Sequence, residues 1–179
     1  MDAQRTVNDE TGARVWALAE SLIFLFIVPG TVAGFVPWWV GRWRVHAPFM
    51  GFAALRVAGG LLMAAGAVIL VDAFLRFALK GLGTPAPFLP PKHLVVTGSY
   101  RYVRNPMYVA VVSLILGQAL LLGDYRVFVY GVCVWAITHV FVVAYEEPKL
   151  RGSFPEEYAV FCIHVHRWAP RLTPWQGNN

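Results

Sequence analysis

Four long apolar runs constrain this chain more than any other feature of its sequence. They cover residues 15–36, 52–79, 108–122 and 125–145. A helix of about 20 apolar residues can cross the hydrocarbon core of a bilayer. The chain is 58% hydrophobic and only 14% charged, whereas about a quarter of the residues of a soluble domain are charged. The runs therefore predict an all-α integral membrane protein with about four transmembrane helices.

The short connection between the last two runs predicts a helical hairpin. Only Gly123 and Asp124 separate these runs, and so brief a link favours antiparallel neighbours. The first run is interrupted by Pro29 and Gly30, which predicts a kinked helix. A chain of 179 residues has room for one membrane domain, 1–179, and not for a second soluble domain.

A further helix is predicted near the C-terminus, where apolar residues recur with helical spacing. Tyr158, Phe161, Cys162 and Val165 stand at i, i+3, i+4 and i+7, which places them on one face. Such an amphipathic helix either lies in the membrane interface or caps the bundle.

The basic residues predict the orientation of the chain in the membrane. With four spans, both termini and the connection between the second and third runs fall on one side. Most of the 15 Lys and Arg residues lie on that side, and basic segments remain in the cytoplasm. Both termini are therefore predicted to be cytoplasmic. The basic residues of the opposite side are Arg42, Arg44, Arg56 and Arg126.

Ionisable residues inside the runs require partners, because an unpaired charge is costly in a membrane. Asp72 and Arg76 stand at i and i+4, so we predict an ion pair along the helix surface. The alternative is that Asp72 faces a polar site. His139 lies seven residues before Glu146, on the same helical face. We expect a neighbouring carbonyl to satisfy His139, and the alternative is that it serves the polar site.

Two polar segments adjoin the ends of apolar runs on the predicted cytoplasmic side. The first, residues 97–108, contains Arg101 and Arg104, whose guanidinium groups suit a carboxylate or a phosphate. The second begins with Glu146 and Glu147, whose carboxylates suit an ammonium or a sulfonium. We predict that the two segments meet and bind a charged cofactor at the membrane surface.

Aromatic residues complete the set of groups that a cofactor could use. Tyr102 and Tyr108 offer ring faces for an adenine or a cation. A ligand with a carboxylate, an amine, a positively charged sulfur and an adenine would use the whole set, and S-adenosylmethionine is such a ligand. A nucleotide would use part of it. In the alternative interpretation, the arginines anchor lipid headgroups and the glutamates pair with Lys149 and Arg151.

The order of the motifs along the chain is informative in itself. They are Gly98-Ser99-Tyr100-Arg101-Tyr102-Val103-Arg104-Asn105-Pro106-Met107-Tyr108, a helical hairpin, Glu146-Glu147 with Leu150, Phe154 and Glu157-Tyr158, and Arg167-Trp168-Ala169-Pro170-Arg171. This order resembles the isoprenylcysteine carboxyl methyltransferase family and the related phospholipid methyltransferases. The resemblance covers residues 92–175, about half of the chain, whereas 15–79 hold the first two spans.

The resemblance implies an integral membrane enzyme that uses S-adenosylmethionine to methylate a lipophilic acceptor, such as an isoprenylcysteine carboxylate. Alternatives are a phospholipid amine, a small thiol, or a non-catalytic lipid-binding protein on the same scaffold. Glu147 and Arg167 are the implied catalytic residues. The implied cofactor-binding residues are Tyr102, Val103, Arg104, Asn105, Pro106, Tyr108, Glu146 and Glu147. The family often has His where this chain has Asn105, and His164 and His166 also depart from its pattern.

The expected partners are a lipophilic or lipid substrate and the membrane lipids. Nucleic acid is not expected, because the basic residues lie at the ends of apolar runs. Cys133 and Cys162 form no CxxC pair, so we predict neither a disulfide nor a metal site. Small residues in the second run, Gly59, Gly60 and Gly66, let a neighbouring helix approach and permit a homodimer.

Overall fold

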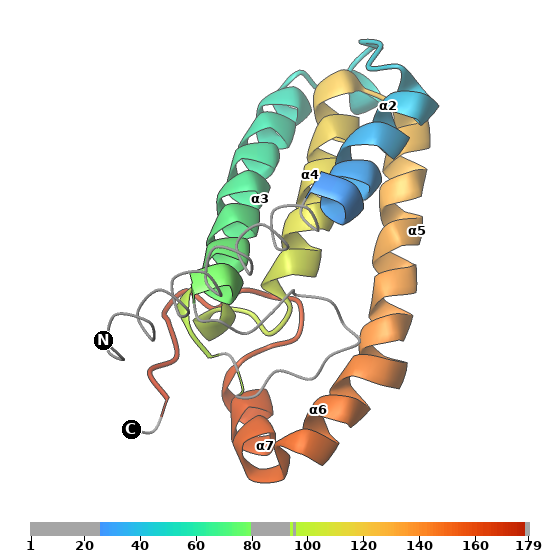
Figure 1. The fold of residues 1–179 in the computed structure, drawn as a ribbon. Coiled ribbons are helices and arrows are strands. Elements are labelled where there is room, and N and C mark those ends of the chain that lie inside the picture. Colours follow the sequence, from blue (N-terminus) through green and yellow to red (C-terminus); the bar gives the residue numbers. More distant parts are fainter. Residues whose placement is uncertain (1–25, 80–93, 95, 178–179) are drawn as a thin grey trace, which may run out of the picture.

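The computed structural model describes residues 26–79, 94 and 96–177, and the regular elements within them are all helices. The ribbon shows long helices packed side by side, with a smaller helical layer at one end (Figure 1). Among the described residues, two helices are long and apolar enough to cross a membrane, Ala54–Arg76 and Tyr125–Ser153. Two shorter apolar helices accompany them, Phe26–Gly41 and Pro106–Leu122. The prediction of an all-α membrane protein is confirmed.

The first described helix contains a wide turn that its sequence explains. It is π-helical at Thr31–Phe35 and continues as α2 (Val36–Gly41). Pro37 has no N–H for the carbonyl of Ala33, four residues earlier, and its ring crowds that carbonyl. The buried amide of Gln118 supplies the missing donor, with Nε2 2.6 Å from Ala33 O. The helix is therefore irregular after Pro29 and Gly30, but Pro37 explains the wide turn. The kink predicted at Pro29 and Gly30 stays a prediction.

The end of this helix differs from the prediction. The sequence predicted an end at residue 36, whereas the helix continues to Gly41, through two tryptophans. It stops where Arg42 and Trp43 adopt φ values of 52° and 50°. Such left-handed residues end a helix but are unusual outside glycine. The predicted beginning of the run, at residue 15, lies outside the described residues.

Glycines allow α3 (Ala54–Leu79) and α4 (Pro106–Leu122) to approach closely. A Cβ atom on Gly59 would lie 2.7 Å from Gly117 O, and one on Gly66 would lie 2.9 Å from Ala110 O. The small residues of α3 thus admit a neighbouring helix, as predicted, and that neighbour is α4. Formation of a homodimer remains a prediction.

The predicted hairpin is confirmed, and local signals define it. Pro106 occupies the first turn of α4, and Gly123 ends that helix with φ 72°. Asp124 caps α5 (Tyr125–Phe141), because its carboxylate accepts the N–H of Arg126 at 2.9 Å. After α5, the same helix continues through a π-helical turn, η4 (Val142–Glu146), into α6 (Glu147–Ser153).

The C-terminal part of the chain covers one end of the bundle. Helix α7 (Pro155–His164) buries Tyr158 and Phe161, and Val165 follows it into the same cluster. Trp175 packs against this cluster. The predicted apolar face is confirmed, and the helix caps one end of the bundle. Its location in the membrane interface stays a prediction.

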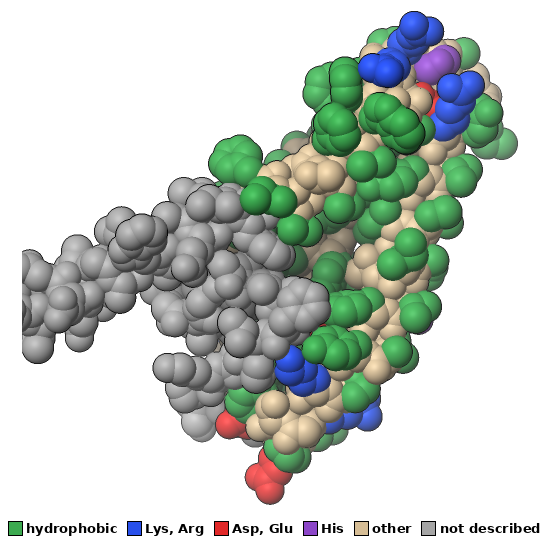
Figure 2. Space-filling model, turned by 45° about the vertical axis from the view of Figure 1, so that its right-hand side comes forward, with side chains coloured by type: hydrophobic (Ala, Val, Ile, Leu, Met, Phe, Trp, Pro, Cys, Tyr) green, Lys and Arg blue, Asp and Glu red, His purple; other side chains and the backbone are tan. Residues whose placement is uncertain are grey.

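The surface matches a protein that is surrounded by lipid. Hydrophobic side chains cover the length of the bundle, whereas Lys, Arg and acidic side chains gather at its two ends (Figure 2). Leu61 and Val68 on α3 and Ile137 on α5 are among the exposed apolar residues. A bundle with an apolar girdle and polar ends is stable in a bilayer and poorly soluble in water.

Candidate functional site

The predicted motifs meet at the end of the bundle where α4 begins and α6 begins. The C-terminal segment 165–175 runs antiparallel beside residues 101–105 and is joined to them by backbone hydrogen bonds. Arg104 N donates to His166 O, Arg171 N to Tyr102 O, and Trp175 N to Arg101 O, each at 2.9 Å. This strap, residues 165–175, holds the first polar segment against α7.

Glu147, the first residue of α6, is the centre of an ionic cluster. Only 5% of its side chain is exposed. Its Oε1 accepts from Arg104 at 3.2 Å and from Arg167 Nε at 2.5 Å, and its Oε2 accepts from Arg167 Nη2 at 2.9 Å. Two parallel bonds to one guanidinium are the strongest form of such a pair. The carboxylate also raises the pKa of Arg167, so this guanidinium stays charged.

A third arginine approaches the same carboxylate. Arg151, one turn further along α6, lies 3.6 Å from Glu147 Oε2, and 64% of its side chain is exposed. The predicted alternative, in which Glu147 pairs with Arg151, is therefore partly realised. Arginines from three parts of the chain surround one carboxylate, so Glu147 joins the start of α4, α6 and the strap.

Arg104 is held inside the protein, which excludes its use as a free lipid anchor. Its Nη1 donates to Glu147 and lies 2.8 Å from Cys162 Sγ on α7. Its Nε is buried and has no hydrogen-bond partner among the described residues. Nη1 of this guanidinium is thus committed to Glu147, whereas the buried Nε is left without an acceptor in the described part of the chain.

Glu146 faces a different set of neighbours from Glu147, although the two are adjacent in sequence. Its Oε2 accepts from the Tyr108 hydroxyl at 3.0 Å. Within the described part of the chain no Lys or Arg pairs with it. The wide turn of η4 ends two residues before Pro148, as the first wide turn ends two residues before Pro37. This π-helical turn ends at Glu146, so it lies directly before Glu147, where the two carboxylates take different partners.

Two more phenols lie near these carboxylates. Desolvation, reinforced by the charge of Glu146, raises the pKa of Tyr100 well above its usual range. Burial likewise raises the pKa of Tyr158. Both phenols therefore remain neutral and can act as hydrogen-bond donors at physiological pH.

The other predicted cofactor residues form the turn that leads into α4. Val103 and Pro106 are buried, and Asn105 Nδ2 donates to Arg167 O at 3.3 Å. Tyr102 is exposed. The side chain of Arg101 turns toward the strap, and its Nε donates to Trp175 O at 2.5 Å. The structure thus brings the predicted segment together with Arg167, while Arg101 is used to fix the strap.

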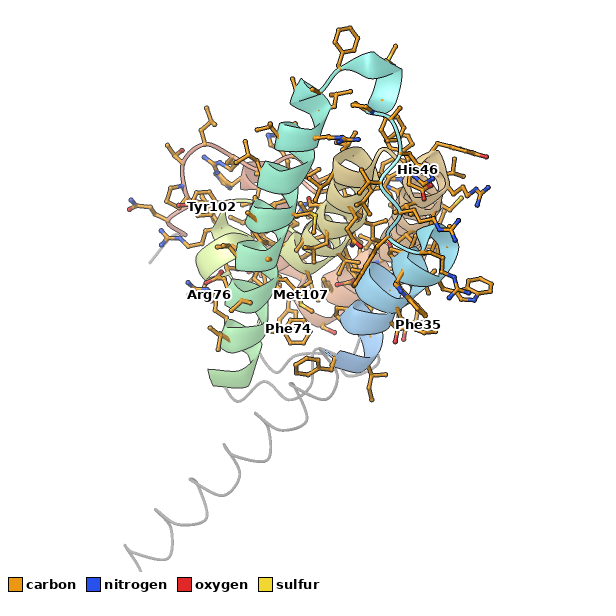
Figure 3. The ribbon with its side chains drawn as sticks, turned by 90° about the horizontal axis from the view of Figure 1, so that it is seen from above. Phe35, His46, Phe74, Arg76, Tyr102 and Met107 are labelled. Carbon is orange, nitrogen blue, oxygen red and sulfur yellow. The ribbon has the colours of Figure 1, made fainter. Side chains whose placement is uncertain are left out.

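The predicted ion pair of α3 is confirmed, and it positions the same turn. Arg76 Nε donates to Asp72 Oδ1 at 2.8 Å, and Asp72 Oδ2 accepts from Ser99 N at 3.0 Å. Ser99 belongs to η3 (Gly98–Arg101). Gly98 has φ 58° and lies against the Arg76 side chain, where any Cβ atom would overlap it. Figure 3 shows Arg76 at the same side of the bundle as Tyr102.

His139 has a different partner from the carbonyl that was expected. Trp168, which follows Arg167 in the strap, donates its indole N–H to His139 Nδ1 at 3.0 Å. This contact joins α5 to the strap about two turns away from Glu147 along the helix.

Sequence reasoning missed three residues of this region. Cys162 was placed on a helix face without a role, and neither Trp168 nor Trp175 was expected to contact residues of the site. Their contacts join residues that are far apart in the chain. One signal was present, since tryptophans and arginines alternate with prolines over residues 167–175, a composition that suits an ordered strap.

These features define a class of protein: an all-helical membrane protein with one site, rich in arginine, glutamate and tyrosine, at the end of its bundle. A family model described as phospholipid methyltransferase matches residues 55–157, more than half of the chain. The chain belongs to this family of membrane methyltransferases, which confirms the resemblance to the phospholipid methyltransferases. The matched region includes Arg104, Glu146 and Glu147, whereas Arg167 lies beyond it. Searches of curated proteins and of solved structures find no match to the chain.

Proposed function

We propose that this protein transfers the methyl group of S-adenosylmethionine to a lipophilic acceptor at the membrane surface. The observation that carries the proposal is Glu146, a partly buried carboxylate that binds Tyr108 and pairs with no Lys or Arg in the described part of the chain. A carboxylate without a counter-ion in such a place favours a cationic ligand. The sulfonium and ammonium groups of S-adenosylmethionine are such cations.

The donors of the site also fit this cofactor. Arg104 Nε is a buried donor without a partner among the described residues, and a carboxylate is the acceptor that a guanidinium binds best. The hydroxyl groups of Tyr100 and Tyr158 remain protonated. The site therefore offers a negative group for a cation and a positive group for an anion, which supports a zwitterionic ligand.

When bound, S-adenosylmethionine supplies an electrophilic methyl group. The residues of this chain then bind the cofactor and the acceptor, orient them and exclude water. These are the main sources of catalysis for a direct transfer. Glu146 would hold the positive end and Arg104 the carboxylate. Glu147 and Arg167, proposed as catalytic, would act together by fixing Arg104 and the strap. Glu147 binds these two arginines, and Arg167 binds Glu147, so their hydrogen bonds are made within the protein.

Two classes of acceptor make different demands on the site. An isoprenylcysteine-like carboxylate is already anionic and requires no base. A phospholipid amine must lose a proton, and Glu146, unlike Glu147, is a carboxylate without an arginine. The description of the matching family and the free carboxylate together favour the amine as a second candidate acceptor. A small thiol would need the same base.

The decisive experiment is calorimetric titration of the detergent-purified protein with S-adenosylhomocysteine, the stable product. We expect binding by the natural protein and at least a tenfold weaker affinity for Glu146→Gln, since a buried charge-assisted contact contributes about 1.5 to 3 kcal/mol. The matched control is Glu157→Gln, on the exposed face of α7, which should bind normally. No binding by a folded, monodisperse natural protein would reject the proposal.

We further propose that the site faces the cytoplasm. The described basic residues at this end include Arg76, Arg101, Arg104, Lys149, Arg151, Arg167 and Arg171. Their number exceeds that at the opposite end, as the positive-inside rule requires. Labelling of a single cysteine placed at Glu157, in sealed inverted vesicles and in intact cells, tests this orientation. We expect labelling in the inverted vesicles and not in intact cells. Labelling in intact cells alone would show that the site faces the opposite side of the membrane.

A further inference from the structure

Several of the residues proposed to hold the cofactor are closed to water. Val103, Asn105 and Glu147 are buried, and the side chain of Arg104 is only 12% exposed. S-adenosylmethionine is charged, so it cannot reach them through the hydrocarbon of the bilayer. The cofactor has to enter from the aqueous face at this end of the bundle, whereas a lipophilic acceptor can arrive through the membrane.

The strap, residues 165–175, lies at this face. It follows α7 and crosses the site end of the bundle, where Figure 1 shows it as a red coil. Its backbone accepts hydrogen bonds from Arg104 N and from Asn105 Nδ2. Its Arg167 side chain binds Glu147 through two hydrogen bonds. The strap is thus bound directly to the residues that the cofactor must reach, and its bonds to them compete with those of a ligand.

Apolar contacts fix the two ends of the strap. Val165 is completely buried in the cluster of Tyr158 and Phe161. Trp175 packs against the same cluster, and its ring stacks on His164 with the centroids 5.3 Å apart. Apolar side chains gain no partner when they move into water. We therefore expect both ends to stay in place when the segment between them moves.

The middle of the strap is held by separate polar bonds and not by a regular ladder. Five residue steps of the strap, from 166 to 171, lie opposite two steps of the first polar segment, from 104 to 102. Regular antiparallel strands advance one residue for one. The excess length is directed outward, where Ala169, Pro170 and Leu172 are exposed. A loop with fixed ends and few bonds between them resembles an Ω-loop, and few contacts are broken when it opens.

The ionic cluster remains compensated when the strap is released. Without Arg167, the carboxylate of Glu147 still has Arg104 at 3.2 Å and Arg151 at 3.6 Å. Its buried charge is therefore not left unpaired, which would be costly. Arg167 is already 29% exposed, so its guanidinium can exchange the carboxylate for water.

We propose that the middle of the strap, residues 166–174, is a gate that opens to admit S-adenosylmethionine and to release its product, while Val165 and Trp175 stay fixed. The inference rests on the proposed function, because it concerns the passage of that cofactor. Arg167 and Trp168 keep the gate closed, because each binds a residue outside the strap. Opening of such a segment limits the rate at which ligands are exchanged.

The first test locks the strap with a disulfide in the double variant Tyr102→Cys/Arg171→Cys. Arg171 N donates to Tyr102 O, and residues paired in this way have Cα atoms about 5.5 Å apart, within the range of a disulfide. Labelled S-adenosylhomocysteine is bound under reducing conditions, and the protein is then oxidised with diamide. We expect the ligand to remain bound through gel filtration and to leave on reduction. Both the association and the dissociation rate constants should fall at least about tenfold on oxidation, with Kd unchanged within about twofold.

The reduced form of the same double variant is the matched control, because it has the same sequence and a free strap. Arg171→Cys alone shows whether Cys133 or Cys162 forms a disulfide in place of the intended one. Trp168→Phe retains a ring but loses the indole N–H that binds His139. It should raise both rate constants about three- to tenfold, the range of one neutral hydrogen bond. General disturbance of the site would change Kd, whereas a gate changes the rates at constant Kd.

Hydrogen exchange tests the gate in the natural protein, without any substitution. The amide of Arg171 donates within the strap contact, and that of Val165 donates to Phe161 O at the fixed end. We expect the Arg171 amide to exchange at least about tenfold faster than the Val165 amide, and to be protected by S-adenosylhomocysteine.

The outcomes separate this inference from the proposed function. Equal rates of ligand exchange in the oxidised and reduced double variant would overturn the gate, as would strap amides that exchange as slowly as those of α7. If the disulfide does not form, Trp168→Phe and hydrogen exchange decide, and unchanged rates in Trp168→Phe together with a slowly exchanging strap reject the gate. Absence of S-adenosylhomocysteine binding by the folded natural protein rejects the proposed function instead.

Discussion

The two ends of the bundle are held together in different ways. At the site, Arg104, Arg151 and Arg167 come from separate parts of the chain and converge on Glu147. The far end lies toward the viewer in Figure 3, where His46 is labelled. There, helix backbones approach closely and polar groups form local hydrogen bonds, such as that of Asp124 with Arg126 N. Gly123, for example, lies so close to Ala47 O that a Cβ atom there would overlap it.

The difference shows that each end depends on a different property of its residues. The site end depends on charges that compensate one another, so loss of one member leaves the others unpaired in a poorly solvated place. The far end depends on small residues and on caps, so added volume or a lost cap is harmful there. At the site end, a charged side chain can bind a ligand in place of another side chain. At the far end, the close backbone contacts allow no such change.

The largest effect is expected for Glu147→Gln, which tests whether charge holds the site end together. The amide keeps the shape but leaves Arg104 and Arg167 without a counter-charge. We expect a loss of about 3 to 5 kcal/mol in the free energy of unfolding, measured by thermal and denaturant unfolding in detergent. Glu157→Gln, on an exposed part of α7, should change stability by less than about 0.5 kcal/mol. Equal effects would show that charge pairing does not hold this end.

Close backbone packing at the far end is tested by Gly59→Ala. A Cβ atom at this position would lie 2.6 Å from Leu121 N and 2.7 Å from Gly117 O. These are backbone atoms, so α3 and α4 must separate, at a cost of about 1 to 3 kcal/mol. The same unfolding experiment measures it.

The neighbouring glycine provides the control for this prediction. A Cβ atom on Gly60 meets nothing within 4 Å, and alanine is the better helix former by about 1 kcal/mol. Gly60→Ala should therefore be neutral or stabilising. A destabilisation equal to that of Gly59→Ala would mean that helix propensity, and not packing, explains the result.

A smaller effect is expected for Asp124→Ala, which removes the cap of α5. The carboxylate accepts the N–H groups of Arg126 and Val127. Loss of such a cap costs about 0.5 to 2 kcal/mol. Asp124→Asn retains an acceptor oxygen and should lose less than half of that amount. If Asn is as harmful as Ala, the charge near His46, 4.0 Å away, is the important feature.

The smallest effect is expected for Arg151→Ala, which probes the edge of the ionic cluster. Arg151 is exposed, and its distance of 3.6 Å from Glu147 is the longest of the three arginine contacts. An exposed pair contributes less than about 1 kcal/mol, and the contribution should fall further in 0.5 M salt. Arg167→Ala is the comparison, because it removes a bidentate bond and should be several-fold more harmful.

Local signals allowed the helices to be predicted from the sequence. Pro106 suits the first turn of a helix, Gly123 readily ends one, and Asp124 caps the next. These residues define the hairpin without reference to the rest of the chain. The end of the first helix could not be predicted in this way, because Arg42 and Trp43 adopt a left-handed conformation that their residue types disfavour.

The meeting of the two polar segments could also be predicted, but the pairing within them could not. Glu147 and Arg167 were expected at one site, and they are in direct contact. Their mutual bond depends on how the strap crosses residues 101–105, which is set by contacts between distant parts of the chain. The wide turn of η4 has a local signal in Pro148, but the direction that it gives to Glu146 depends on Tyr108.

The uninterrupted path from α5 into α6 also acts as a ruler. From Tyr125 to Glu147 the helix rises about 33 Å at about 1.5 Å per residue, close to the hydrocarbon thickness of about 30 Å. The cap at one end and the carboxylate at the other therefore stand at opposite boundaries of the bilayer. In a thicker membrane the rod must stand more upright or draw the leaflets together. For the proposed methyl transfer, membrane thickness would thus be a variable that the lipids themselves set.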